Sequence, residues 1–298
     1  MQQSPYPAIQ SFLDYLKFEK RYSPNTLGSY QTDLEQFFHY TEDIFGTTGP
    51  GEFTAVIIRS WLASLKNNKI SAKSINRKIS SLKSFFKYLL KQGVIQQTPA
   101  ATVISPRNSK RLPVYVEEKD TETLFKDVPF QDDWKGKTDR LVLLMFYHTG
   151  MRLSGLLGLK ESQLDDSYGQ IKVLGKGNRE RIIPVSGDLL KEVKEYIMEK
   201  PVRLENVSQI FVNEKGKPLY PKYVYNLVHR NLAKVSTIRK KSPHVLRHTF
   251  ATHLMNQGAE LNAVKELLGH SSLAATQIYT HNTIEKLREV FQKAHPKA

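Results

Sequence analysis

The sequence predicts a mainly α-helical protein of two domains, the second of which carries a small β-sheet. Apolar residues recur at helical spacing through residues 1–105. A polar stretch at about 98–113, punctuated by Pro99, Pro106 and Pro113, then interrupts the pattern and is typical of a linker. Beyond it, helical patterns continue around two short strand-like runs. We therefore expect an all-helical domain over 1–105 and a mixed domain over 106–298.

Four helices are expected in the first domain, each with one apolar face. The first two carry the apolar sets Ile9, Phe12, Leu13 and Leu16, and Tyr30, Leu34, Phe37 and Phe38. Ser23 followed by Pro24 is a typical start for the second helix. A third helix is expected over 54–65. The fourth has the stripe Ile75, Ile79, Leu82, Phe86 and Leu89, and Gly93 is a typical stop.

The second domain begins with helices expected over 119–128 and 137–149. Strands are expected over 170–174 and 179–185, joined by a hairpin at Gly175-Lys176-Gly177-Asn178, with a further strand over 209–213. Helices are then expected over 187–199, 221–235, 244–257, 260–268, 272–280 and 284–293. The small strand content makes the class α with a β element.

The charge of the chain indicates a polyanionic partner. There are 44 Lys and Arg against 29 Asp and Glu, a net charge of +15. Nucleic acid is the first interpretation and an anionic membrane surface the second. The region of the fourth helix has basic residues with no Asp or Glu between them, and a solvated face normally mixes signs. We expect this face to bind DNA through Lys66, Lys69, Lys73, Arg77, Lys78, Lys83 and Lys87.

Several classes of protein are disfavoured by composition. The chain has no cysteine, so disulfides and thiolate metal sites are excluded, and a reducing compartment fits. The longest strongly apolar stretch, near 141–147, is far too short to span a membrane. Residues 1–17 lack the basic flank and apolar core of a secretory signal.

Chemistry at a phosphodiester needs donors around the phosphoryl oxygens, a nucleophile and an acid for the leaving oxygen. The sequence shows no carboxylate cluster typical of a magnesium site and no Walker-type glycine loop, so Arg, Lys and His must substitute, and no metal or cofactor is expected. His244 and Arg247 are three residues apart after Pro243, which favours a phosphate clamp at a helix start. A zinc site at His244 and His248 would lack a catalytic Glu and a third ligand.

Several other motifs are each too short to indicate a function alone, but their order along the chain is informative. Most tyrosines are packing or surface residues, because a phenol is a weak nucleophile unless its proton is managed. Here, however, five motifs follow one another: Thr149-Gly150-Met151-Arg152, Gly175-Lys176-Gly177, His244-Val245-Leu246-Arg247-His248, Leu268-Gly269-His270 and Tyr279-Thr280-His281. This series resembles the tyrosine recombinase (phage integrase) family. Three further segments resemble the Xer branch of this family, typified by XerC and XerD. They are Phe12-Leu13-Asp14-Tyr15-Leu16, Ser23-Pro24-Asn25-Thr26 and Lys110-Arg111-Leu112-Pro113.

The resemblance implies a fold and a set of roles. The fold would be a core-binding (SAM-like) DNA-binding domain followed by a catalytic domain, together forming a C-shaped clamp around DNA. Tyr279 would attack the scissile phosphate, forming a 3′-phosphotyrosyl bond and releasing a 5′-hydroxyl. Arg152 and Arg247 would bind the non-bridging oxygens. Lys176 would protonate the departing 5′-oxygen, His244 would manage the tyrosine proton or the phosphate charge, and His270 would donate to a non-bridging oxygen.

One position departs from the family pattern. The family usually has an acidic residue three positions after the first arginine, and here that residue is Gly155. Reduced activity, or compensation by another acid such as Glu161, is therefore open.

The resemblance also implies partners and a location. The last amphipathic helix, with Ile284, Leu287, Val290 and Phe291, either packs on its own domain or docks in a neighbouring subunit of a cyclic tetramer. Double-stranded DNA with an inverted-repeat site is the expected substrate, bound by a self-tetramer or a heterotetramer with a second tyrosine recombinase. Whether a DNA translocase is a further partner stays open from the sequence. The implied location is the bacterial cytoplasm, at the nucleoid.

The implied activity is strand exchange through a Holliday junction, serving chromosome dimer resolution or the integration and excision of a mobile element. Three alternatives stay open from the sequence: a catalytically impaired DNA-binding homologue, a type IB topoisomerase-like enzyme, and a basic structural protein.

Overall fold

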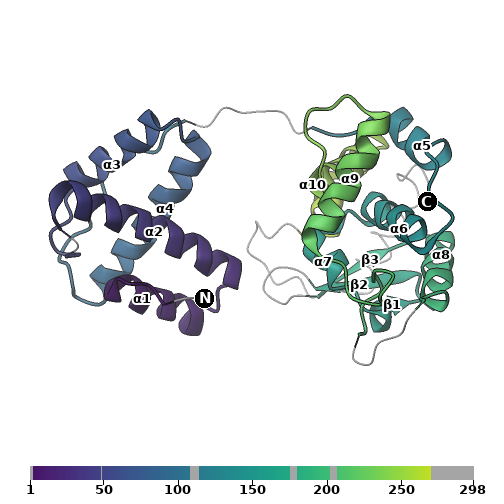
Figure 1. Cartoon of the computed structure of the whole chain (residues 1–298), viewed down its shortest axis with the longest axis horizontal. Coiled ribbons are helices and arrows are strands. Elements are labelled where there is room, and N and C mark those ends of the chain that lie inside the picture. Colours follow the sequence, from purple (N-terminus) through teal and green to yellow (C-terminus); the bar gives the residue numbers. More distant parts are fainter. Residues whose placement is uncertain (1–2, 48, 108–113, 175–179, 202–206, 270–298) are drawn as a thin grey trace. The chain divides into compact units, whose positions relative to one another are not determined.

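The computed structural model describes residues 3–47, 49–107, 114–174, 180–201 and 207–269 (Figure 1). The chain divides into two compact units, Met1–Arg111 and Leu112–Ala298. The first is helical, and the second combines helices with one small sheet, as the sequence predicts.

The first unit contains the four predicted helices, α1 (Pro7–Asp14), α2 (Pro24–Phe45), α3 (Ala55–Asn67) and α4 (Ala72–Lys91). A π-helical turn, Tyr15–Glu19, continues α1. The starts of α2, α3 and α4 are capped by Ser23, Thr54 and Ser71, whose hydroxyls accept backbone N–H bonds three residues on. The local sequence therefore determines where these helices begin.

Aromatic side chains pack together with aliphatic ones in the core of the first unit. Phe12, Phe37, Phe38 and Phe85 are fully buried, and Phe37 packs edge-on against Trp61 with ring centroids 5.1 Å apart. Because these rings come from all four helices or their immediate neighbours, burying them holds the helices as one body.

The second unit is built around α6 (Trp134–Thr149), whose residues 141–149 are all buried. Around it lie α5 (Glu118–Lys126), α7 (Leu153–Leu157), α8 (Gly187–Met198), α9 (Pro221–Val235) and α10 (Pro243–Asn256) (Figure 1). A further helix, α11 (Leu261–Leu268), packs against α10. The second half of α6 is buried on every side, as expected of a helix in the middle of a domain. This central helix ends at Gly150, whose left-handed backbone (φ 54°) turns the chain toward Arg152.

The sheet is antiparallel with the order β1-β2-β3, comprising Leu164–Asp165, Gln170–Leu174 and Glu180–Pro184. The predicted pairing of the two longer strands is confirmed, with Ile171 opposite Ile183 and Val173 opposite Arg181. The strand β1 was not expected, because two residues are too few to show an alternating pattern.

Some expectations in the second unit are wrong or fall outside the described residues. Residues 209–213 form no strand. They make two isolated bridges, Lys160 with Gln209 and Val212 with Pro218. Their apolar run reflects burial, since Ile210 and Phe211 are fully covered. The helix α7 was not expected, and the helices expected over 272–280 and 284–293 lie outside the described residues.

Among the helices of the described ranges, none is both long and apolar enough to cross a bilayer.

A buried histidine ties α10 to the start of the second unit. His253 is 1% exposed, and its Nε2–H donates to the carbonyl oxygen of Val116 at 2.9 Å. Nδ1 lies 3.2 Å from the hydroxyl of Tyr147, from which it accepts a hydrogen bond when the ring is neutral. Burial lowers the pKa of His253 against the opposing effects of the Val116 carbonyl and Glu118.

We predict that this histidine makes the second unit less stable in mild acid. Because the folded pKa is depressed, the unfolded chain binds the proton first, so stability is lost as pH falls below about 6.5. In His253→Gln, the slope of unfolding free energy against pH between 5 and 7 should drop by up to about 1.4 kcal/mol per pH unit. Chemical denaturation at a series of pH values measures the slope. His229→Gln, at an exposed histidine, is the control, and equal slopes in the wild type and His253→Gln would contradict the prediction.

Candidate functional site: a cluster of arginines beside a cationic pocket

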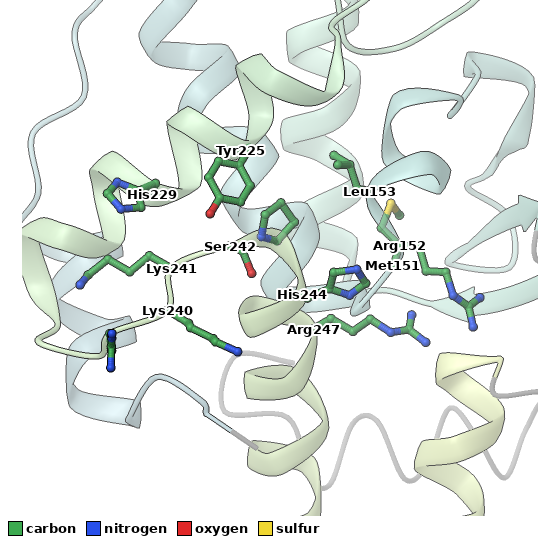
Figure 2. A pocket seen from close by; sticks show the side chains of 12 residues that line it. Met151, Arg152, Leu153, Tyr225, His229, Lys240, Lys241, Ser242, His244 and Arg247 are labelled. Carbon is green, nitrogen blue, oxygen red and sulfur yellow. The ribbon is translucent and has the colours of Figure 1, made fainter. Parts of the chain in front are cut away.

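A pocket of about 380 Å³ opens between the starts of α7 and α10 and the side of α9. Figure 2 shows Arg152, His244 and Arg247 close together in it, with Tyr225, His229 and two lysines farther along. Its twelve lining residues include the cations Arg152, Arg239, Lys240, Lys241 and Arg247, and none of the twelve is acidic. Such a lining favours an anionic ligand with more than one charge.

Two of these arginines are placed by helix starts. Arg152 is the N-cap of α7 in an extended conformation, which directs its side chain off the helix, and its Nη2 donates to the carbonyl oxygen of Gly269 at 2.9 Å. Arg247 lies one turn into α10 and is 5% exposed. Its Nη2 donates to the carbonyl oxygen of Leu268 at 2.6 Å, and its Nη1 donates to that of Gly150.

His244 lies at the second position of α10, after Pro243, and its ring is exposed to the pocket (Figure 2). The spacing of three residues puts His244 and Arg247 on one face of the helix, as expected. The N–H groups of this first turn point the same way, which adds to the attraction for an anion.

A third guanidinium, which the sequence analysis missed, belongs to Arg181 on β3. Its side chain is 5% exposed, and its Nη1 donates to the carbonyl oxygen of Leu267 at 2.8 Å. A signal existed, because alternation along 179–185 puts Arg181 on the same face as Ile183 and Val185, both buried. A cation among inward positions of a strand requires a specific partner.

These three guanidiniums meet one feature, the carboxyl end of α11. Leu267, Leu268 and Gly269 each present a carbonyl oxygen to a different arginine. Carbonyls at a helix end have no intrahelical partner, and the helix dipole makes this end negative. Gly269 ends the helix in the left-handed conformation with φ 62°.

The cluster is electrostatically unbalanced in the free protein. Burial, followed by the charges of Arg181 and Arg152, lowers the pKa of Arg247 to about 9. Backbone carbonyls offset this repulsion only in part, because they are dipoles and not charges. A bound phosphate diester would relieve it, since opposite charge favours the protonated guanidinium.

The residue at the position of the family's acidic group has little room around it. Gly155 lies in α7, and a Cβ atom there would stand 3.1 Å from Cγ1 of Val173. Glu161, named as a compensating acid, instead accepts from Nζ of Lys200 at 2.6 Å and does not line the pocket. Within the described ranges, no group of three or more His, Asp or Glu side chains is arranged to hold a metal ion.

Three of the six predicted catalytic residues are therefore brought together, namely Arg152, His244 and Arg247. The other three, Lys176, His270 and Tyr279, lie outside the described residues. His270 follows directly on Gly269, which Arg152 contacts.

The predicted DNA-binding residues divide into two groups. Lys66, Lys69, Lys73 and Lys87 are exposed, and so is Lys83, although its ammonium donates to the Val103 carbonyl at 3.2 Å. The placing of Lys78 on a solvent-facing basic surface is wrong, because it is 5% exposed. Its Nζ contacts Oδ1 of Asp33 at 3.0 Å.

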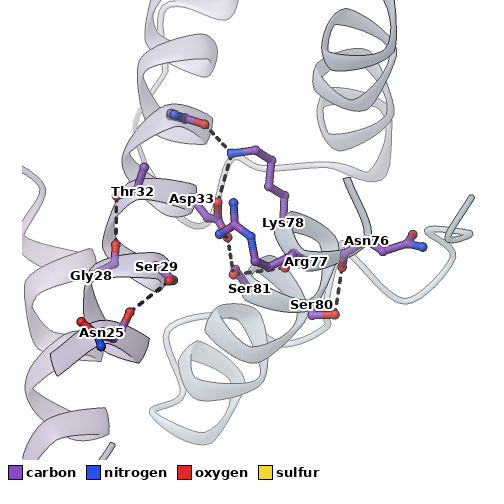
Figure 3. A network of polar contacts seen from close by, with 11 residues as sticks. Asn25, Gly28, Ser29, Thr32, Asp33, Asn76, Arg77, Lys78, Ser80 and Ser81 are labelled. Atoms are coloured by element: carbon purple, nitrogen blue, oxygen red, sulfur yellow. Dashed lines mark hydrogen bonds and ion pairs between the residues drawn. The ribbon is translucent and has the colours of Figure 1, made fainter. Parts of the chain in front are cut away.

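Asp33 accounts for the apparent one-sign charge of this helix. This carboxylate of α2 is 1% exposed and accepts from Arg77, Lys78 and the hydroxyl of Ser81 (Figure 3). Arg77 remains half exposed beside it. The sequence of the basic stretch gives no sign of this partner, which lies more than forty residues away in the chain.

Two family profiles match the chain. The profile described as "Phage integrase family" matches residues 115–286, and the one described as "Phage integrase, N-terminal SAM-like domain" matches residues 9–93. Solved structures agree in fold. XerH site-specific recombinase bound to palindromic difH substrate, a post-cleavage complex, has a TM-score of 0.72 at 23% identity and covers 94% of this chain and 83% of that one. The Tn1549 transposon integrase with circular intermediate DNA has a TM-score of 0.69 at 20% identity, covering 96% and 99%.

Curated relatives are more similar in sequence. Tyrosine recombinase XerC of Chlorobaculum parvum is 36% identical over 317 residues, covering 97% of this chain and 94% of that protein. Tyrosine recombinase XerC of Listeria monocytogenes serovar 1/2a is 38% identical over 293 residues, covering 97% of each. Since both the family profiles and these near-full-length relatives agree, the chain belongs to the phage integrase family of tyrosine recombinases.

Proposed function

We propose that this protein is a site-specific DNA recombinase of the Xer type, which cleaves and rejoins strands through a 3′-phosphotyrosine and a Holliday junction. The observation that carries the proposal is the convergence of Arg152, His244 and Arg247 at a cationic pocket with no acidic lining residue. Membership of the family gives this geometry its chemical meaning.

The proposed reaction uses the two arginines as a clamp. Each guanidinium has five N–H donors, so the carbonyl bonds of Arg152 and Arg247 leave donors for the non-bridging oxygens of a phosphate. As the nucleophile attacks, negative charge grows on these oxygens. Fixed cations in a buried setting stabilise that charge without reorganising.

The remaining steps are assigned to residues by the family motif. The phenol of Tyr279 gives its proton to His244 or to solvent and bonds to phosphorus. The bond to the 5′-oxygen breaks, and Lys176 supplies the proton that makes the 5′-hydroxyl. His270 donates to a non-bridging oxygen. Rejoining reverses these steps with the 5′-hydroxyl of a partner strand, so the sequence of bond exchanges needs no external energy source.

Binding to duplex DNA is proposed to use both units. The exposed lysines Lys66, Lys69, Lys73 and Lys87 would contact phosphates, and Arg77 would do so from beside Asp33. Lys240 and Arg239 extend the positive pocket lining beyond the cleavage site, where flanking phosphates would lie. The proposed DNA target is an inverted-repeat site, which the protein would bind as a tetramer of identical subunits or together with a second recombinase. The proposal also includes a DNA translocase as a partner and a location at the bacterial nucleoid.

A second candidate, a DNA-binding homologue with impaired catalysis, is favoured by one observation. Gly155 supplies no carboxylate, and Glu161, the acid considered in its place, is engaged by Lys200. Such a protein would bind the same DNA and form little or no covalent complex.

We predict that the protein forms a covalent complex with a nicked duplex carrying the inverted-repeat site that it selects from a random-sequence pool. The nick lets the short 5′-ended strand diffuse away, which traps the phosphotyrosine as a gel-stable adduct. Tyr279→Phe should abolish the adduct. Arg247→Ala should slow its formation by about 10²- to 10³-fold, because one set of transition-state donors is lost. Binding without any adduct in the wild type would favour the impaired homologue.

We also predict that DNA affinity falls steeply with salt and that the exposed lysines carry part of the slope. Lys73→Gln together with Lys87→Gln should make the slope of log K against log salt shallower by about 2, since each phosphate contact contributes roughly 0.9. Binding titrations at several salt concentrations measure this.

Lys78→Met is the matched control for these lysine substitutions. It should leave the slope unchanged but destabilise the first unit by about 3 kcal/mol, because it removes a buried partner of Asp33. A shallower slope in Lys78→Met, or an unchanged slope in the double variant, would contradict the assignment.

A further inference from the structure

The apolar packing of α11 connects this helix to α10 but does not connect its carboxyl end to the sheet. The helix has eight residues, a length that is not stable alone. Its apolar side chains Val264, Leu267 and Leu268 pack with Phe250 and Leu254 in a small cluster separate from the main core. That cluster ties α11 to α10 and contains no residue of the sheet.

Arg181 supplies the connection from this end of the helix to the sheet. It lies on β3 opposite Val173 and two residues before Ile183, both of which belong to the main core. Its Nη1 reaches the carbonyl oxygen of Leu267. Gly269 lies directly against it, since a Cβ atom there would stand 3.1 Å from both Cδ and Nη1 of Arg181.

The next two carbonyls belong to the arginines of the cleavage pocket. The carbonyl of Leu268 orients Arg247, and that of Gly269 orients Arg152. The three carbonyls belong to consecutive residues at one helix end, so a shift of the backbone at Leu267 is passed on to Leu268 and Gly269. Any displacement of Leu267 would therefore disturb both catalytic guanidiniums.

A purely structural requirement would not favour a cation here. Burying a charge is costly, and the charge of Arg181 also opposes that of Arg247. An apolar side chain of the same length would fill the space without that repulsion. The cation does what an apolar residue would not, which is to bind the helix end by a directed bond and add positive potential behind the phosphate site.

We propose that Arg181 is a positioning residue of the cleavage pocket, which anchors the carboxyl end of α11 and thereby holds Arg247 and Arg152 in place for the scissile phosphate. This inference rests on the proposed recombinase function. Arg181 acts through the two pocket arginines. Its loss should therefore lower the cleavage rate and leave the affinity for DNA nearly unchanged.

The test compares Arg181→Met, Arg181→Lys and Val264→Ala in the full chain. The rate of adduct formation is measured at saturating nicked DNA, and the dissociation constant is measured separately. Arg181→Met should slow adduct formation by about 10- to 100-fold with a dissociation constant within about threefold of the wild type. Arg181→Lys should recover most of the rate, because an ammonium there keeps the charge and a donor for the Leu267 carbonyl.

Val264→Ala is the structural control. It weakens the packing of α11 and should lower the melting temperature by several degrees, since it removes buried methyl groups. Because it leaves the three arginine bonds intact, its adduct rate below that temperature should stay within about threefold of the wild type. A rate loss in Arg181→Met no larger than in Val264→Ala would overturn the proposal.

Amide hydrogen exchange of the α11 segment gives a readout that does not depend on cleavage. Exchange in 261–269 should quicken by at least about tenfold in Arg181→Met relative to the wild type, since local opening of the helix end becomes easier. Unchanged exchange would overturn the anchoring role even if the enzyme is active. If the wild type forms no adduct while exchange responds as expected, the recombinase proposal fails and the anchoring of α11 stands.

Discussion

The site depends on how the carboxyl end of α11 is bound. Its last carbonyls, unpaired by the rules of helix geometry, accept bonds from Arg181, Arg247 and Arg152, which come from a strand, a helix and a helix cap. The bonds bring together three mutually repelling cations that would otherwise separate. This arrangement orients the cations and makes the pocket strongly positive before any DNA arrives, and such preorganisation is how fixed charge contributes to catalysis.

In the first unit, too, an acceptor far away in the sequence orients basic side chains, but there the acceptor is a charged carboxylate and the outcome is the opposite. The buried carboxylate of Asp33 neutralises Lys78 and holds Arg77 at the surface. Lys78 is thereby buried and has no surface to offer a ligand, whereas Arg77 stays half exposed. In the second unit the cations meet carbonyl dipoles instead of a carboxylate, so positive charge remains for a ligand. The two units thus treat a similar excess of basic residues differently.

The departure at Gly155 fits this picture. The residue packs toward Val173 of β2, and the register opposes Val173 to Arg181. A family member with an acid at this position would bring negative charge to the same region of the sheet. Here backbone carbonyls bind the arginines of the pocket, so this support does not require a side chain at position 155.

Most of the fold could be predicted from the sequence, because helix caps and apolar stripes are local signals. Ser23, Thr54 and Ser71 start their helices as residues of their type do, and the turn residues between two strand-like runs predicted the pairing of 170–174 with the strand after it. The clamp of His244 and Arg247 was predictable too, since a spacing of three sets a common helix face. The family resemblance added Arg152.

Only the tertiary structure decided which basic side chains are available and which are not. Lys78 and Lys73 look alike in the sequence, yet one is buried on Asp33 and the other is exposed. Arg181 looks like one more cation of a hairpin, yet it meets Leu267, which lies 86 residues away in the chain. Sequence patterns report local geometry, whereas the partner of a charge is determined by contacts between distant segments, and those exist only once the chain has folded.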